Sequence, residues 1–158
     1  MRLSDVLSVS AIAVGLDKPE KWAVIESLTE LLVVSGQARP EWREVILRGL
    51  SEREKQSSTG MPDGFAIPHC RMDDPIQSTL VSLAVLKDGM DFDAIDGQLT
   101  HLVVCLVTPK KQNREHLRVL AGIAQLFASA EFRNALLSAK VAEEVLAIIR
   151  EEEKRLGL

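Results

Sequence analysis

The sequence contains no tyrosine, and its only aromatic residues are two tryptophans and four phenylalanines. A surface that stacks the bases of single-stranded nucleic acid depends on aromatic rings, so the composition does not support such a surface. An excess of positive charge is also missing, because 19 lysines and arginines are outweighed by 23 aspartates and glutamates, for a net charge of −4. Together, these shortages argue against a nucleic-acid-binding protein.

Long apolar runs are absent as well. No segment approaches the roughly 20 apolar residues that a membrane-spanning helix requires, and residues 1–22 contain no sustained apolar stretch ahead of a small-residue cleavage site. The two cysteines, Cys70 and Cys105, are 35 positions apart and form no CxxC pair. A reducing compartment would keep both as thiols. We therefore expect a cytoplasmic protein without direct membrane insertion.

The remaining composition is that of an ordinary globular protein. Hydrophobic residues make up 46% and charged residues 27% of the 158 residues, close to the averages for soluble domains. No repeat and no low-complexity linker divides the chain. We expect one domain over residues 1–158.

The order of the periodic segments predicts helices first, then strands, then helices again. Predicted helices, marked by apolar periodicity and by capping or turn residues, cover residues 17–36, 40–56, 109–127, 130–138 and 141–155. Continuous β-rich apolar runs predict strands covered on both faces at residues 79–86 and 102–107. This order predicts an α/β fold, a single domain with a mixed central β-sheet flanked by helices on both faces.

Two finer expectations follow from the same patterns. Asp96-Gly97 predicts a tight turn between the two strands. The helix after Pro109 is expected to bury one apolar stripe, made of Leu117, Leu120, Ile123, Ala124 and Phe127.

His69 is the first of three histidines to consider for chemistry. It follows the short apolar segment 65–68, which in turn follows the loop 57–64, rich in glycine and hydroxyl groups. A histidine at the exposed end of a strand can project into a cleft, with its tautomer fixed by the group that bonds its other nitrogen. From position alone, an ordinary loop histidine remains an alternative.

The loop 57–64 has hydroxyls and glycines suited to holding a phosphate through backbone N–H groups. It lacks the Gly-Lys-Ser/Thr ending of a nucleotide-binding P-loop, and no GxGxxG motif for a dinucleotide occurs. Around His116, four basic side chains lie within nine residues, from Lys110 to Arg118. Either segment could be an anion site. The alternatives are that the loop 57–64 is an ordinary turn and that residues 110–118 are a solvated helix start.

Five side chains could in principle bind zinc: His69, Cys70, His101, Cys105 and His116. Their spacing matches no known zinc motif, and Cys105 lies inside an apolar strand. As neighbours on a strand, His69 and Cys70 would point to opposite faces, which also argues against a paired thiol nucleophile. We expect no metal and no other cofactor.

The stretch from Met61 to Cys70, MPDGFAIPHC, resembles the active-site signature of the enzyme IIA domains of the bacterial phosphotransferase system, fructose/mannitol type. The other landmarks of this resemblance span most of the chain: Arg53, Glu54, Ser58-Thr59-Gly60, residues 91–97 and His116-Leu117. Within the family, FDAIDGQ and LVVCLVTPKKQNREHL look most like the nitrogen-regulatory enzyme IIA.

The resemblance implies a phosphocarrier. His69 would accept a phosphoryl group on Nε2 from an HPr-type phosphocarrier protein, then pass it to a IIB partner or report phosphorylation state to regulatory targets. Arg53 would neutralise phosphoryl charge, His116 would donate to a phosphoryl oxygen, and Ser58 and Thr59 would complete the phosphate-binding site. No cofactor is implied, because the phosphoryl donor is a phosphohistidine rather than a nucleotide.

Two positions depart from the family pattern, which usually has glycine in place of Pro62 and an aliphatic residue in place of Phe65. Cys70 also replaces the commoner glycine after the histidine. Proline fixes φ at roughly −65° and removes an N–H, so Pro62 is expected to change the loop backbone or remove a phosphate-directed donor. This residue favours the alternative function, a regulatory or interaction module that keeps the fold without being phosphorylated.

Overall fold

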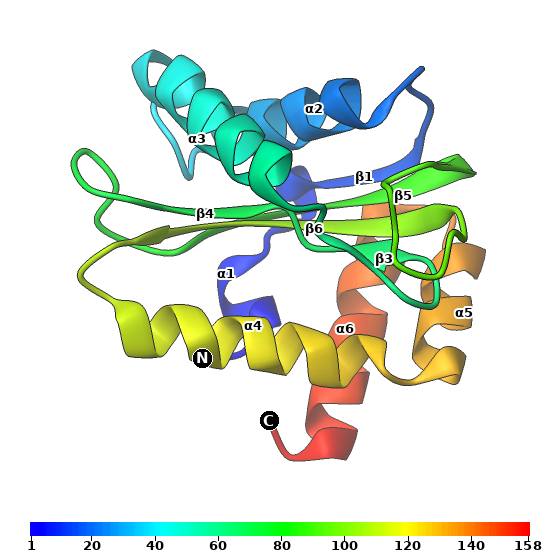
Figure 1. Ribbon diagram of the computed structural model, residues 1–158. Coiled ribbons are helices and arrows are strands. Elements are labelled where there is room, and N and C mark those ends of the chain that lie inside the picture. The colour runs from blue at the N-terminus through cyan, green and yellow to red at the C-terminus, as the bar shows by residue number, and fades with distance from the viewer.

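A six-stranded sheet separates two layers of helices in the computed structural model, which describes residues 1–158 (Figure 1). The helices are α1 (Leu3–Val6), α2 (Lys21–Val34), α3 (Arg43–Gln56), α4 (Asn113–Phe127), α5 (Ala130–Ser138) and α6 (Ala142–Leu156). The strands are β1 (Ile12–Leu16), β2 (Gly60–Met61), β3 (Phe65–Ala66), β4 (His69–Met72), β5 (Leu80–Met90) and β6 (Thr100–Pro109). Short 3₁₀ turns, η1 (Val9–Ala11) and η2 (Pro40–Trp42), precede β1 and α3. The architecture confirms the predicted mixed sheet with helices on both faces.

Strand β6 has partners along both of its sides. On one side it pairs antiparallel with β5, which continues parallel to β1. On the other side β3 and β4 follow each other along β6, both parallel to it, and β2 pairs antiparallel with β3. Between β3 and β4 lie Ile67 and Pro68, and because proline has no N–H to give to a ladder, the strand is interrupted there. The interruption directly precedes His69.

The two faces of the sheet carry separate cores. A cluster of 22 buried residues lies on the side of α1, α4, α5 and α6, and a cluster of 17 lies on the side of α2 and α3. Along β6 the two clusters alternate, with Val104 in the first and Val103 and Cys105 in the second. Both faces of this strand are therefore buried, as its continuous apolar run predicts.

Helix α2 begins later than the sequence predicts. Its first residue is Lys21, and Glu20 is an extended N-cap without a side-chain bond, so Asp17 does not cap the helix. The reason is β1, which continues to Leu16 and leaves the next four residues to turn the chain from strand to helix. Gly36 follows the helix end with φ +78, as its role as a stop requires.

The buried stripe of α4 also differs from the prediction. Leu117 is 59% exposed, whereas the residue before it, His116, is only 5% exposed. Of the predicted stripe only Ile123 and Phe127 are buried, and the helix buries His116, Val119 and Leu126 beside them. The helix can turn a histidine inward because Thr108 of β6 bonds its ring, which offsets the desolvation of a polar group. The predicted turn at Asp96-Gly97 is present, with the Gly97 N–H donating to the Ala94 carbonyl at 2.9 Å.

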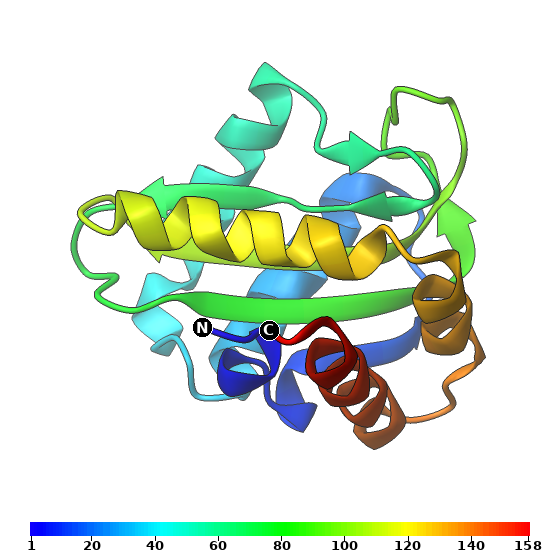
Figure 2. The ribbon, with the colours of Figure 1, turned by 90° about the horizontal axis from the view of Figure 1, so that it is seen from below.

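The two ends of the chain lie side by side (Figure 2). Arg2 Nε donates to the carbonyl oxygen of Leu158 at 2.7 Å. The N–H of Ser4 donates to Glu153 Oε1 at 3.1 Å, and the Ser4 hydroxyl donates to the other oxygen of the same buried carboxylate. No helix in the protein combines the length and apolarity needed to span a bilayer.

Candidate active site

His69 is the first residue of β4, not the end of a strand as the sequence predicts. Its ring is partly buried, while the next residue, Cys70, is buried in the core on the α2–α3 side. Nδ1 of His69 lies 2.7 Å from the carbonyl oxygen of Ile67. A carbonyl can only accept, so the neutral imidazole carries its proton on Nδ1 and leaves the lone pair of Nε2 free.

Burial is the main cause that lowers the pKa of His69 below its ordinary value, and the charge of Arg53 lowers it further. The bond to the Ile67 carbonyl and the charge of Glu54 act in the opposite direction. The net lowering favours the neutral ring at neutral pH. A neutral ring is the form with a nucleophilic nitrogen.

His116 faces His69 from the first turn of α4. The ring centroids are 5.5 Å apart and the ring planes are inclined by 48°. Thr108 Oγ1 lies 2.7 Å from Nδ1 of His116. Burial, together with the nearby His69 and Arg71, lowers the pKa of His116 to about 4, so this ring is also neutral at pH 7. When the Thr108 hydroxyl donates to Nδ1, the proton of the neutral ring is on Nε2, where it can be donated to an anion.

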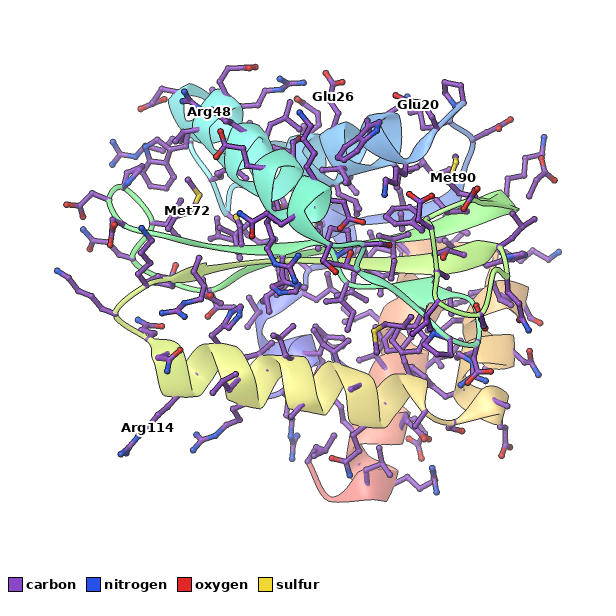
Figure 3. The ribbon with its side chains drawn as sticks, in the orientation of Figure 1. Glu20, Glu26, Arg48, Met72, Met90 and Arg114 are labelled. Atoms are coloured by element: carbon purple, nitrogen blue, oxygen red, sulfur yellow. The ribbon has the colours of Figure 1, made fainter.

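A cleft of about 490 Å³ opens beside both histidines, between α3 and β4. Arg48 on α3 and Met72 at the end of β4, both labelled in Figure 3, belong to its walls. The lining carries two acidic side chains, Glu52 and Asp73. Cationic side chains are more numerous: Arg48, Arg53, Arg71 and Lys110. The cleft is suited to an anion that approaches His69.

Arg53 reaches the cleft from the last turn of α3. Its Nη1 donates to the carbonyl oxygen of Ser57 at 3.0 Å, which anchors one side of the guanidinium. The remaining N–H groups are free to bind an anion, since no other hydrogen bond of Arg53 is formed. The structure thus brings His69, His116 and Arg53 to one cleft.

The family model described as "Phosphoenolpyruvate-dependent sugar phosphotransferase system, EIIA 2" matches residues 5–152. The chain belongs to this family. The resemblance in the sequence is therefore confirmed, and the two rings, the free Nε2 and the cationic cleft lie within an EIIA domain.

Relatives of this EIIA chain have both regulatory and sugar-specific names. A "Nitrogen regulatory protein" of Pseudomonas aeruginosa is 34% identical over 150 residues, which are 94% of this chain and 95% of the relative. A "PTS system fructose-specific EIIABC component" of Bacillus subtilis is 31% identical over 98% of this chain, which spans only 24% of that relative. The crystal structure of nitrogen regulatory protein IIA-Ntr from Neisseria meningitidis has a TM-score of 0.84 and 29% identity, covering 93% of this chain and 98% of that one.

Ser58 and Thr59 are not among the residues that line the cleft of the EIIA chain. The Ser58 hydroxyl donates to the carbonyl oxygen of Phe92, and the Thr59 hydroxyl donates to Glu54 at 2.5 Å. Both hydroxyl hydrogens are therefore used inside the protein. This geometry does not support the predicted role of the two residues in holding phosphate.

The two departures from the family pattern also lie outside the cleft. Pro62 is exposed in the turn between β2 and β3. Phe65 is buried, and its ring lies 5.2 Å from that of Phe127, centroid to centroid. Pro62 is thus placed where it removes no donor from the cleft lining, and Phe65 extends the core.

No three side chains of His, Cys, Asp or Glu come together in a metal-binding arrangement. Cys105 is fully buried, and burial raises the pKa of its thiol. Burial also raises the pKa of Cys70 to about 12, which keeps this thiol protonated and unreactive.

Sequence reasoning missed Thr108, the partner of the second histidine. Thr108 follows the apolar run 102–107, eight residues before His116, inside a stretch that carries the resemblance, but nothing in the sequence connects its hydroxyl to the His116 ring. Glu54 was noted only as a landmark of the resemblance. Its contacts with Thr59 and Lys21 are seen only in the structure.

Proposed function

We propose that this EIIA chain is a phosphocarrier in which Nε2 of His69 accepts a phosphoryl group from an HPr-type phosphocarrier protein. One observation carries the proposal: the 2.7 Å bond from Nδ1 to the Ile67 carbonyl, which leaves Nε2 unprotonated beside a cationic cleft. Membership of the EIIA 2 family supports it.

The transfer is a direct displacement at phosphorus. The lone pair of His69 Nε2 attacks the phosphorus, the bond from phosphorus to the histidine nitrogen of the donor breaks, and its electron pair returns to the donor ring. The proton stays on Nδ1 of His69, hydrogen-bonded to the Ile67 carbonyl, so no proton has to move during the step. A preorganised nucleophile of this kind needs positioning and charge stabilisation from its surroundings.

Arg53 and His116 supply that stabilisation. The free N–H groups of Arg53 neutralise charge on the phosphoryl oxygens, and neutral His116 donates from Nε2 while Thr108 holds its other nitrogen. Such donors lower the barrier where charge develops in the transition state. The cleft is open to a protein partner, as transfer between two proteins requires.

After transfer, we propose that the same step runs in reverse toward a IIB partner in the cytoplasm, or that the phosphorylated state is read by regulatory targets. The names of the relatives support both outcomes, one being a nitrogen regulatory protein and one an EIIABC component. The match to the nitrogen regulatory protein covers 94% of this chain and 95% of that relative, and it favours the regulatory outcome.

Intact-mass measurement tests the proposal. Incubation with phosphoenolpyruvate and the general phosphotransferase proteins should add the mass of one phosphoryl group to the wild type and none to His69→Ala. His101→Ala is a matched control, because His101 lies outside the cleft, and it should be phosphorylated normally. A wild type that gains no phosphoryl group would refute the phosphocarrier function and leave the interaction module.

A further inference from the structure

We propose that Glu54 and Thr59 are positioning residues that fix the tautomer of His69. The proposal rests on the phosphocarrier function of the same histidine, and it assigns to Thr59 a role other than phosphate binding. The two residues act through a path of hydrogen bonds that runs over the backbone of Ile67.

The carboxylate of Glu54 is the start of the path. Its side chain is fully buried, on the last turn of α3 directly after Arg53, and does not line the cleft. Oε1 accepts the N–H of Thr59 at 3.0 Å, and Oε2 accepts the Thr59 hydroxyl at 2.5 Å. Two oxygens that hold two donors of one residue fix both its position and its orientation.

The buried charge of this carboxylate is balanced by Lys21. Its Nζ lies 3.4 Å from Glu54 Oε1 and 2.7 Å from Oδ2 of Asp93, and the Lys21 side chain is only 11% exposed. A buried carboxylate without such a partner is costly. The Lys21 ammonium keeps a second partner, Asp93, so loss of Glu54 does not leave it unpaired.

The path continues from Thr59 to the imidazole. The carbonyl oxygen of Thr59 accepts the N–H of Ile67 at 3.2 Å, and the carbonyl oxygen of Ile67 accepts the proton of His69 Nδ1 at 2.7 Å. Since the next residue is Pro68, the peptide that bears the Ile67 carbonyl has no N–H of its own to anchor it. The orientation of this carbonyl therefore depends on the bonds of the residues on either side, which are Ile67 N–H to Thr59 and Pro68 C=O to Leu106.

This dependence matters because the neighbouring ladders are short. Strands β2 and β3 have two residues each, and beyond their mutual ladder only Phe65 and Ala66 pair with β6. Without the Glu54–Thr59 contact, the Ile67 carbonyl is free to turn away from Nδ1. The imidazole then populates the tautomer with its proton on Nε2, which presents no lone pair to the cleft.

The tautomer of His69 can be measured by ¹⁵N NMR of histidine-labelled, unphosphorylated protein. The wild type should have the proton on Nδ1. Thr59→Val, which keeps the shape but removes the hydroxyl, and Glu54→Met, which removes both acceptors, should show a mixture of tautomers. Phosphorylation of His69 should slow about tenfold in Glu54→Met, by analogy with the lower end of the roughly 10–100-fold effect of losing a residue that orients a metal-bound histidine, and less in Thr59→Val.

Two further variants separate positioning from general damage. Thr59→Ser keeps the hydroxyl and should restore the wild-type tautomer and rate. Glu44→Met, an equal change at an exposed position of the same helix, should leave both unchanged. Thermal unfolding identifies which variants are folded. Thr59→Val is expected to fold because the Glu54 carboxylate keeps two partners, the backbone N–H of residue 59 and Lys21.

An unchanged His69 tautomer in folded Thr59→Val and Glu54→Met would overturn the positioning role, whatever their rates. The tautomer is read without any phosphoryl donor, so this result is independent of the proposed function. A wild type with the Nδ1 proton that never accepts phosphate would refute the phosphocarrier function alone.

Discussion

Replacing His116 by alanine should slow phosphorylation of His69 about a hundredfold, and replacing Arg53 about tenfold. Removal of one preorganised donor to a developing charge costs about 2.7–4 kcal/mol, and each 1.36 kcal/mol or so is a factor of about ten in rate. His116 is only 5% exposed, so its N–H donates where water is largely excluded. Because the cleft itself is open to solvent, we take the lower end of the 2.7–4 kcal/mol range, or about 2.7 kcal/mol.

The smaller effect of Arg53 follows from its surroundings. Its side chain is partly exposed, and one of its N–H groups is already bound to the Ser57 carbonyl. Solvent screens a charge in this position, and we therefore expect about half of the free energy that His116 supplies.

A single-turnover time course with excess phosphorylated HPr-type donor measures both rates. Urea unfolding is the control for stability: His116→Ala should lose about 1–3 kcal/mol because Thr108 is left without its partner, while Arg53→Ala should unfold like the wild type. Wild-type rates in both variants would refute the three-residue site. A larger effect of Arg53 than of His116 would refute the ranking by burial. Complete loss in His116→Ala, with phosphate mapped to His116 in the wild type, would show that the other histidine is the nucleophile.

Three other outcomes test the same structure. Burial lowers the pKa of His116 to about 4 in the folded protein. Below the ordinary pKa of a histidine, the unfolded chain therefore binds more protons than the folded one, and stability falls as the pH falls. Urea unfolding should therefore show up to about 2 kcal/mol less stability at pH 5 than at pH 7, and His116→Gln should reduce this difference. Phe65→Ala should lower the free energy of unfolding by about 3–5 kcal/mol, because it removes a buried ring packed against Phe127; a loss under 1 kcal/mol or so would contradict the packing. Chelator treatment should leave the thermal transition unchanged, since no cluster of metal ligands exists; a large drop would reveal a metal site.

The long elements were predictable from local pattern. The run that includes residues 102–107 is apolar without alternation, and the structure buries both faces of β6. Gly36 lies just after the end of α2, and Pro40 begins the 3₁₀ turn η2 that precedes α3, three residues before that helix starts at Arg43. These signals depend only on neighbouring residues, so they predict helices and strands without any knowledge of the tertiary contacts.

The short elements were not predictable in this way. Strand β4 exists because it pairs with β6, far along the chain, strand β2 has only two residues, and β1 interrupts its apolar pattern with Gly15. The inward face of α4 was misplaced for a related reason: His116 is polar, and only the distant Thr108 makes its burial acceptable.

In the candidate site, too, some residues could be identified from the sequence and others could not. His69, His116 and Arg53 were identified through the resemblance, and the fold brings them to one cleft. For Ser58 and Thr59, the residue type indicated hydrogen bonding but not its partner. The partners are Phe92 and Glu54, which the sequence alone does not connect to them.

The adjacent ends of the chain bear on how this domain can be joined to others. Arg2 and Leu158 are hydrogen-bonded, and neither end lines the cleft of His69. A tag or a second domain fused at either end would start from the same point on the surface and leave the cleft accessible. A short linker between residues 158 and 1 would also close the chain into a ring without crossing the cleft.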